Sequence, residues 1–153
     1  MIVKKLKEFL DKNGVHYEVI RHPTSYTAQE TAEAAHISGT KIAKTVIVNI
    51  DGDLAMVVVP ANQKVILQGL REITGADDVR FAQEDDFESL FPGCETGAMP
   101  PFGNLYGMDV FVSPTLAQQE EIVFNAGTHR DLVKMSYRDF ERLVEPQVLS
   151  FSH

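Results

Sequence analysis

A two-residue turn between two β-branched runs is the feature that most restricts how this chain of 153 residues can fold. Residues 44–50 read KTVIVNI, residues 54–59 read LAMVVV, and Asp51-Gly52-Asp53 stands between the two runs. An Asp-Gly pair favours a type I′ turn, whose twist matches that of two antiparallel strands. The sequence therefore predicts a β-hairpin at residues 44–59, and the fold has to be built around a sheet.

Helical and strand patterns alternate on both sides of this hairpin. Helices are predicted where apolar residues recur at helical spacing or where a capping-box sequence begins a segment, as at Thr27 and Ser136. The helices span residues 2–13, 28–36, 65–74, 85–90 and 137–144, and the other strands span residues 15–20, 79–81, 108–112, 122–125 and 132–135. This order predicts an α+β (mixed α/β) fold, in which a single domain over residues 1–153 holds a mixed sheet flanked by helices.

Charge and hydropathy exclude several classes of protein. The formal net charge of −8 argues against broad electrostatic capture of nucleic acid, so a nucleic-acid partner would have to be held locally. The longest apolar run, at residues 54–59, is too short to span a membrane, and the N-terminal residues lack the apolar stretch of a signal peptide. Cys94 is the one cysteine, so no intrachain disulfide can form. The sequence predicts a cytoplasmic protein without a membrane partner.

Motifs for nucleotide, metal and redox chemistry are missing from the sequence. It contains no GxxxxGK[ST] or GxGxxG run, no HExxH and no paired CxxC. The five histidines are scattered without the spacing of metal ligands. We therefore expect no cofactor and a mechanism without a metal.

A short loop combines two glycines with two adjacent prolines. Residues 97–104 read GAMPPFGN, in which Gly97 and Gly103 flank Pro100-Pro101. Glycine allows positive φ and the close approach of another group, whereas proline fixes φ and removes a donor. The combination predicts a fixed and exposed loop that presents backbone groups to a ligand.

Three reactive side chains each have an ordinary and a functional interpretation. Lys44 is either a solvated lysine at a strand edge or an ammonium that faces a cleft, where it can pair with a phosphate or polarise a carbonyl. His129 follows an apolar strand, where a polar histidine in a loop is ordinary. Cys94 is either a small buried residue, which is the better supported interpretation, or a nucleophile with His129 as its base.

Three motifs in this order resemble the YbaK/prolyl-tRNA synthetase editing-domain family. They are KT at residues 44–45, GAMPPFG at residues 97–103 and NAGTH at residues 125–129. The resemblance covers nearly the whole chain and implies a barrel-like mixed sheet. It also implies an aminoacyl-tRNA deacylase, which hydrolyses the ester of mischarged tRNA without a metal or cofactor. Because synthetase signatures are missing, the chain is similar to a free-standing, trans-editing member.

The resemblance also implies roles for particular residues. The strand-leading lysine of the family falls on Lys44, and its GxxxP loop falls on Gly97 and Pro101. The implied catalytic residues are Lys44 and Gly97, and the implied substrate-binding residues are Ala98, Met99, Pro100, Pro101, Gly103 and His129. The amides of residues 97–99 would stabilise the oxyanion of the tetrahedral intermediate, and Lys44 would hold the terminal phosphate or the ester region.

The expected partner is the acceptor end of an aminoacyl-tRNA, delivered by a synthetase or an elongation factor. A stiff loop would limit the pocket to a small amino acid, so tRNA(Pro)-type substrates or tRNAs mischarged with serine, threonine or alanine are expected. A local positive face is expected from Lys4, Lys5, Lys7, Lys12, Arg130, Lys134, Arg138 and Arg142. Two other functions stay open: a non-catalytic binding module for a small aminoacyl or nucleotide-like ligand, and a thiol hydrolase built on Cys94.

Overall fold

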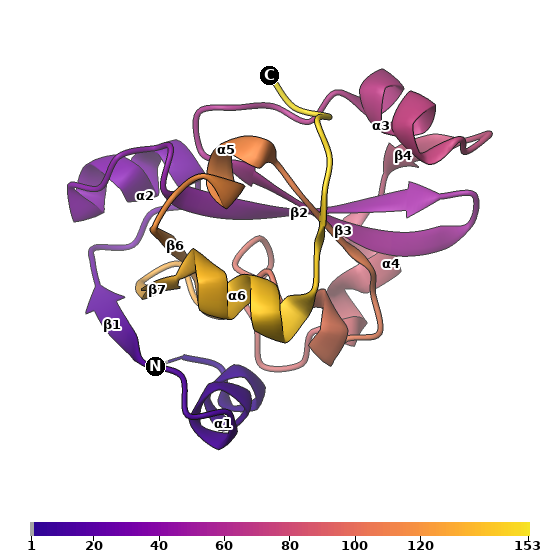
Figure 1. The fold of residues 1–153 in the computed structure, drawn as a ribbon. Helices are drawn as coiled ribbons and strands as arrows, with labels where there is room; N and C mark the ends of the chain where they lie inside the picture. Colours follow the sequence, from indigo (N-terminus) through magenta and orange to yellow (C-terminus); the bar gives the residue numbers. More distant parts are fainter. Residues whose placement is uncertain (1) are drawn as a thin grey trace.

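The computed structural model describes residues 2–153 and contains one eight-stranded sheet surrounded by helices (Figure 1). The strands are β1 (Tyr17–Arg21), β2 (Ile42–Ile50), β3 (Asp53–Pro60), β4 (Val79–Phe81), β5 (Val110–Val112), β6 (Glu121–Asn125), β7 (Asp131–Ser136) and β8 (Gln147–Val148). The helices are α1 (Lys4–Lys12), α2 (Ala28–Ala35), α3 (Leu67–Thr74), α4 (Glu84–Phe87), α5 (Pro114–Ala117) and α6 (Tyr137–Val144), with 3₁₀ turns at Glu88–Leu90 and Gly103–Leu105. Within the described chain, no helix has the length and apolar character needed to cross a membrane.

The β2–β3 hairpin runs through the middle of the sheet. Its antiparallel register ends with Ile50 opposite Asp53, so Asp51 and Gly52 are the two loop residues. Their φ angles are 50° and 96°, and a type I′ turn requires positive φ at both positions. The side chain of Asn49 accepts the Gly52 N–H at 2.8 Å and holds the turn. The predicted hairpin is confirmed.

The second edge of β2 is divided between two strands. The strands pair in the order β1-β7-β6-β2-β3-β5-β8, and β4 pairs with β2 outside this path. On the edge away from β3, β2 is parallel to β6 at Ile42 and Ala43 and antiparallel to β4 at residues 48–50. Parallel and antiparallel pairs therefore occur in one sheet, which confirms the predicted mixed sheet. In the described chain, residues 44–46 have no strand partner on this edge.

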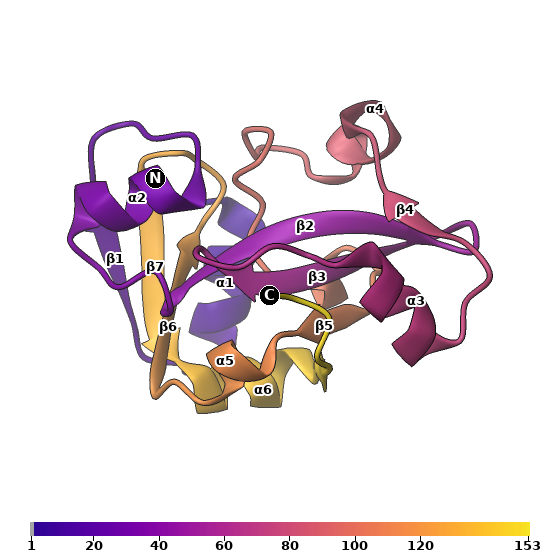
Figure 2. The ribbon, with the colours of Figure 1, turned by 90° about the horizontal axis from the view of Figure 1, so that it is seen from above.

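Helix α2 covers the end of the sheet that contains β1, β7 and β6 (Figure 2). Ala32 of α2 packs in one buried cluster with Ile42 of β2 and Val123 of β6. The Thr27 hydroxyl accepts the Glu30 N–H at 3.0 Å and caps the helix, as the capping-box sequence predicts. Helix α2 is therefore held on the face of β2 to which Ile42 points.

The main core fills the opposite face of β2. Side chains alternate along a strand, so Ala43 points away from Ile42. Ala43 belongs to the largest buried cluster, together with Leu6 and Leu10 of α1 and Phe140 of α6. The α2 face is thus left as the side of β2 on which a groove can form.

The predicted elements match the observed ones to within two residues at each end, except that the helix predicted at residues 85–90 is α-helical only to Phe87 and continues as the 3₁₀ turn Glu88–Leu90. Helix α3 ends at Gly75, which has a φ of 71°, as expected of a glycine that stops a helix. Three short elements were not predicted: α5, β8 and the 3₁₀ turn at Gly103–Leu105. Segments of two to four residues are too short to show a periodic pattern.

The loop at residues 97–104 is fixed but largely buried, so the prediction that it is exposed is wrong. Gly97 is exposed, whereas residues 98–103 are buried. The ring of Phe102 packs against Phe124 and Phe140 in the main core and draws the loop inward. A Cβ atom on Gly103 would lie 2.6 Å from Cγ2 of Val110. Gly103 is therefore required by packing.

Replacing Gly103 with alanine is expected to lower the free energy of unfolding by about 1–3 kcal/mol, because the added methyl group would overlap Val110 and the Met108 carbonyl. Gly69 in α3 is the matched control, since an added Cβ atom there has its nearest neighbour at 3.8 Å and alanine is the better helix former. Urea denaturation measures both variants. Equal stabilities for Gly103→Ala and Gly69→Ala would contradict this role of Gly103.

Candidate functional site

Lys44 lies on β2 at the point where the pairing of β2 with β6 ends. It follows the alternation of the strand and so is on the same face as Ile42, which α2 covers. The half-buried side chain lines a groove of ≈ 210 Å³ between the start of α2 and the segment after β3. The groove is lined by Thr27, Ala28, Gln29, Lys44, Ala61, Asn62, Gln63 and Lys64.

A larger hollow of ≈ 520 Å³ runs along α2 and adjoins this groove. The two share Gln29, Ala61 and Asn62, so they form one continuous depression. The larger part contains the acidic Glu33 and does not reach Lys44. The positively charged side chains of the depression therefore lie at its smaller end, in the Lys44 groove.

The pKa of Lys44 is lowered from its ordinary value of 10.5, first by burial and then by the positive charge of Lys64. Burial disfavours the charged ammonium because it removes water, and a second cation disfavours it by repulsion. The groove thus holds an ammonium that would be stabilised by an anion.

Gly97 lies in a tight turn of residues 95–98. The Ala98 N–H donates to the carbonyl oxygen of Glu95 at 3.0 Å, and Gly97 supplies the positive φ, 86°, that such a turn needs at its third position. Two bonds fix the turn to the β6–β7 loop: the Glu95 N–H donates to the carbonyl oxygen of Gly127 at 2.7 Å, and the Gly127 N–H donates to that of Ala98 at 2.9 Å. In the described chain the Gly97 N–H donates to no other protein group, so it stays available to a ligand.

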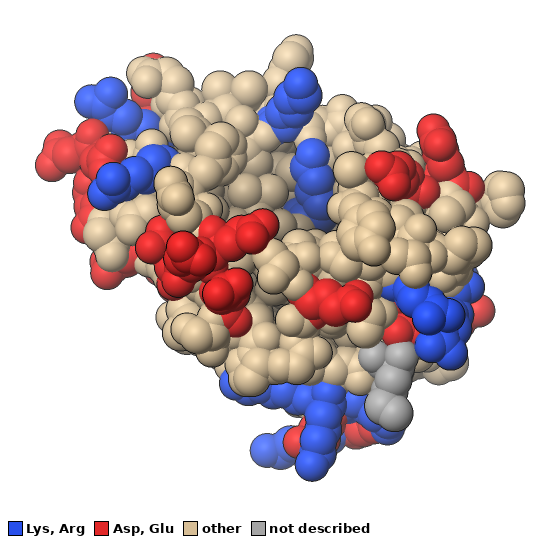
Figure 3. Space-filling model, turned by 180° about the vertical axis from the view of Figure 1, so that it is seen from behind, with Lys and Arg blue, Asp and Glu red and all other residues tan. Residues whose placement is uncertain are grey.

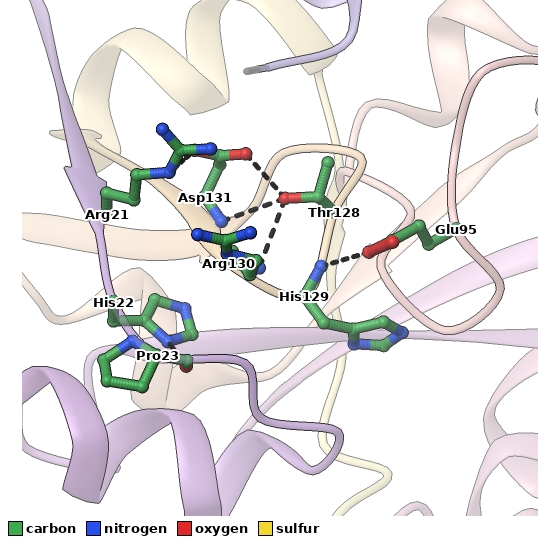
Figure 4. A network of polar contacts seen from close by, with 8 residues as sticks. All are labelled: Arg21, His22, Pro23, Glu95, Thr128, His129, Arg130 and Asp131. Carbon is green, nitrogen blue, oxygen red and sulfur yellow. Dashed lines mark hydrogen bonds and ion pairs between the residues drawn. The ribbon is translucent and has the colours of Figure 1, made fainter.

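His129 lies directly against this turn, as Figure 4 shows for its position beside Glu95. Its Nε2 donates to the carbonyl oxygen of Thr96 at 2.8 Å, because a carbonyl can only accept. Its backbone N–H donates to Oε1 of Glu95 at 2.7 Å. A Cβ atom on Gly97 would lie 3.4 Å from Cε1 of His129. The fold therefore brings together two residues that the sequence predicted for the site.

The loop that carries His129 is fixed by its own polar contacts (Figure 4). The Thr128 hydroxyl donates to Oδ2 of Asp131 at 2.7 Å and accepts the Asp131 N–H at 3.0 Å. Arg21 of β1 places Nε 3.7 Å from Oδ1 of the same carboxylate. These contacts fix the backbone around His129 without a bound ligand.

Tyr26 connects His129 to the Lys44 groove, and the sequence did not indicate it. The rings of Tyr26 and His129 have centroids 5.0 Å apart, although Tyr26 is 73% exposed. The neighbouring Ser25 N–H donates to the carbonyl oxygen of His129 at 3.2 Å. Thr27, the next residue, lines the groove. Gly97, His129 and Lys44 are therefore joined through one short segment before α2.

Asn125 is a second residue that the sequence did not single out. Ala43 of β2 and Phe124 of β6 are the last parallel pair, so Lys44 and Asn125 are the first residues after the point where the two strands part. The buried Oδ1 of Asn125 has no hydrogen-bond partner among the described residues. The one available signal was its place at the start of the NAGTH motif.

The other predicted substrate-binding residues are buried around the turn. They are Ala98, Met99, Pro100, Pro101 and Gly103. Met99 packs in the main core, and the Ala98 N–H is used within the turn. The expectation that Ala98 keeps its N–H free for an oxyanion is therefore wrong for this conformation, whereas the contribution of these residues to substrate binding stays a prediction.

Cys94 is a half-buried residue that packs against the main core. Burial raises the pKa of its thiol, which disfavours the thiolate that a nucleophile requires. The Nε2 atom of His129 already donates to Thr96. Cys94 thus has the character of a structural residue. Among residues 2–153, no group of three or more His, Cys, Asp or Glu side chains could hold a metal ion.

The sequence of the site and its surroundings matches a known family. Residues 22–143 match the family model of the aminoacyl-tRNA editing domain. The chain belongs to this family. The matched part of the aminoacyl-tRNA editing domain includes Lys44, Gly97 and His129, so it spans the whole candidate site.

The editing domain is similar to proteins of two kinds. It is 25% identical to the multifunctional Ser/Thr-tRNA deacylase ProXp-y of Escherichia coli K12, over 97% of this chain and 91% of that protein. It is 26% identical to the proline–tRNA ligase of Staphylococcus aureus strain bovine RF122 over 88% of this chain, which corresponds to 25% of the ligase. A crystal structure described as a candidate trans-editing enzyme for prolyl-tRNA synthetase shares the fold, with a TM-score of 0.85 and 20% identity over 98% of this chain and 96% of that one.

Glu95→Ala is expected to loosen the loop that carries His129, because the carboxylate accepts the His129 N–H. We expect a loss of about 1 kcal/mol in the free energy of unfolding and faster hydrogen exchange at the His129 amide. Glu95→Gln keeps an acceptor oxygen and is the matched control, with a smaller change in both. Unchanged exchange at this amide in Glu95→Ala would show that the bond does not hold the loop.

Lys44→Met is expected to be more stable than the wild type at pH 7, because the groove disfavours the ammonium. The pKa of Lys44 is lower in the folded protein than in the unfolded chain, so the unfolded chain binds more protons. The charged lysine therefore lowers the free energy of unfolding by its full amount below the folded pKa, and this loss disappears as the pH rises toward 10.5. Thermal unfolding between pH 7 and 10.5 should show a stability gap that narrows as the pH rises. The exposed Lys41→Met is the control, and a gap that is the same at every pH would contradict the prediction.

Proposed function

We propose that this aminoacyl-tRNA editing domain hydrolyses the ester bond between a small amino acid and a tRNA to which it was wrongly attached. The family match over residues 22–143 carries the proposal, because it includes Lys44, Gly97 and His129. Gly97 lies against His129, and the segment of Tyr26 and Thr27 runs from the ring of His129 to the groove that contains Lys44. The site therefore supports the chemistry that the family name describes.

The reaction requires a hydrogen-bond donor that stabilises the negative charge developing on the carbonyl oxygen. Water adds to the ester carbon, and the carbonyl electron pair moves to oxygen. The tetrahedral intermediate then expels the ribose oxygen, which takes up the proton that the attacking water gives up. The exposed Gly97 N–H has no other partner in the described chain and can donate to this oxyanion. Because glycine has no side chain, the ester can approach the amide beside His129.

Lys44 is assigned to binding negative charge and not to activating water. A protonated lysine has no lone pair with which to accept a proton. The carboxylate at the turn, Glu95, is already bound to the His129 N–H. We therefore assign the activation of water to the neighbouring ribose hydroxyl of the substrate, as the family resemblance suggests, and the orientation of the ester to the protein.

A small amino acid is the proposed cargo because the wall behind Gly97 cannot easily move. Residues 98–101 are buried, and the two prolines restrict their backbone. A rigid wall excludes larger side chains by steric overlap. The Escherichia coli relative is named a Ser/Thr-tRNA deacylase, and the Staphylococcus aureus relative is named a proline–tRNA ligase. We propose serine, threonine or alanine on a tRNA, with tRNA(Pro) among the acceptors.

Contact with the tRNA is proposed to be confined to its acceptor end. Four of the eight cations expected to form a positive face lie beside carboxylates, which neutralises that face in part. The ion pairs are Lys4 with Glu8, Lys7 with Asp11, Lys134 with Glu18, and Arg142 with Asp139. A net charge of −8 adds a repulsion of the tRNA, which salt screens beyond about 8 Å. Delivery by a synthetase or an elongation factor would compensate for such a small interface.

A deacylation assay tests the proposal. Wild-type protein, Lys44→Ala, Lys44→Arg and the control Lys41→Ala are incubated with tRNAs charged with alanine, serine, threonine, cysteine or proline, and the remaining ester is counted. We expect wild type to remove at least one small amino acid, Lys44→Ala to be slower by about 10²-fold, and Lys44→Arg to keep part of the rate because the charge is retained. Lys41→Ala should act like wild type.

Each failure in this assay has a distinct meaning. Binding of charged tRNA without any loss of ester would favour the non-catalytic binding module. Loss of activity in Cys94→Ser would favour the thiol hydrolase. Full activity of Lys44→Ala would contradict the role of Lys44 but not the deacylase function.

A further inference from the structure

We propose that Lys64 is a second phosphate-binding residue, which acts beside Lys44 in the groove at the start of α2 and holds a phosphate group of the tRNA 3′ end. The identity of the ligand as tRNA rests on the proposed function. The phosphate site itself is inferred from the groove.

The groove has the composition of an anion site. Both lysines line it, and no acidic side chain is among the residues that surround it. Asn62 and Gln29 add amide groups at its rim, and both are exposed. Figure 3 shows basic side chains at a hollow in the upper middle of this face, with acidic side chains on the surfaces around it. Phosphate is the anion that two adjacent ammonium groups of a tRNA-binding protein would meet.

The two lysines share with Lys5, Lys12 and Lys41 the absence of an ion pair among the described residues, but Lys44 and Lys64 line one groove together. Lys4, Lys7 and Lys134 each lie within 4.0 Å of a carboxylate oxygen. In the part of the chain that the structure describes, neither Lys44 nor Lys64 forms such a pair. Repulsion between them also contributes to the lowered pKa of Lys44. Two cations held together without a counter-ion are typical of a binding site.

The backbone of Lys64 is held by hydrogen bonds to His153. The Lys64 N–H donates to the carbonyl oxygen of His153 at 3.0 Å, and the His153 N–H donates back to that of Lys64 at 3.0 Å. The side chain of the preceding Gln63 donates to the Thr115 hydroxyl at 3.0 Å and accepts the Ser152 hydroxyl at 2.6 Å. Lys64 therefore projects from an anchored position and not from a mobile loop.

The start of α2 supplies two more donors to the same groove. Thr27 caps the Glu30 N–H, but the N–H groups of Ala28 and Gln29 have no partner in the described chain. Both residues line the groove. Backbone N–H groups at the start of a helix favour a negative charge, and here they add to two ammonium groups. A phosphate in the groove would meet donors from three separate segments.

Steady-state deacylation separates binding from chemistry at this site. Lys64→Gln is expected to raise KM about fivefold and to leave kcat within about twofold, because one phosphate contact is lost and no group assigned to the ester is changed. The slope of log KM against log salt should fall by about 0.7, the value for one contact to a single strand. Lys64→Arg should restore both, and Lys41→Gln should change neither. An unchanged KM and salt slope in Lys64→Gln would overturn the proposal.

A binding measurement tests the site without any enzymatic activity. Calorimetry or NMR titration compares adenosine 5′-monophosphate with adenosine at constant ionic strength, so that the phosphate is the only difference. The wild type is expected to prefer the monophosphate, and Lys64→Gln should lose most of that preference, while circular dichroism confirms that the variant is folded. Equal preference in the two proteins would overturn the inference. If the wild type deacylates no tRNA, the proposed function fails and this titration still decides the phosphate site.

Discussion

The division of one edge of β2 between β6 and β4 is the constraint on which the site depends. β2 cannot shift, because its other edge is paired with β3 from Ala43 to Ile50. The parallel pairing with β6 ends at Ala43, and the pairing with β4 begins only at Val48. Lys44 stands at the start of this interval, on the face that α2 covers. Sites in α/β proteins also form where neighbouring strands part, because a side chain there has room to reach a ligand.

A second set of contacts joins segments that are distant in the sequence. Glu95 bonds to both Gly127 and His129, and Ala98 accepts the Gly127 N–H. These bonds hold the Gly97 turn against His129 before any substrate is present. A donor that is already in place needs no reorganisation when charge develops on the substrate. The buried prolines behind the turn serve the same purpose, because they restrict the wall against which the turn rests.

The electrostatics of the protein differ between the whole surface and the site. The net charge is −8, yet the acidic side chains are spread over the surface, and several of them lie beside lysine and arginine side chains. Screening limits the reach of such charges to about 8 Å at physiological salt. The groove of Lys44 and Lys64 contains no carboxylate among its lining residues. An acidic protein can therefore attract a phosphate at one place and repel the rest of a nucleic acid.

The elements of the fold follow from local sequence, and the environment of the site does not. The hairpin, the helix caps and the strand positions could be predicted because turn chemistry, capping and periodicity act within a few residues. Lys44, Gly97 and His129 were indicated by short motifs. The burial of residues 98–103 could not be predicted, because it depends on the packing of Phe102 against Phe124 and Phe140.

The same limit applies to the partners of the site residues. The sequence by itself determined which segments become strands and helices and which motifs carry the chemistry. Only the tertiary structure decided that Glu95 binds His129, that Asn125 and Lys44 both follow the last pair of β6 and β2, and that Lys64 shares the groove of Lys44. Each of these contacts joins segments far apart in the chain, and the physical reason is that strand register and packing set such distances, whereas local preferences do not.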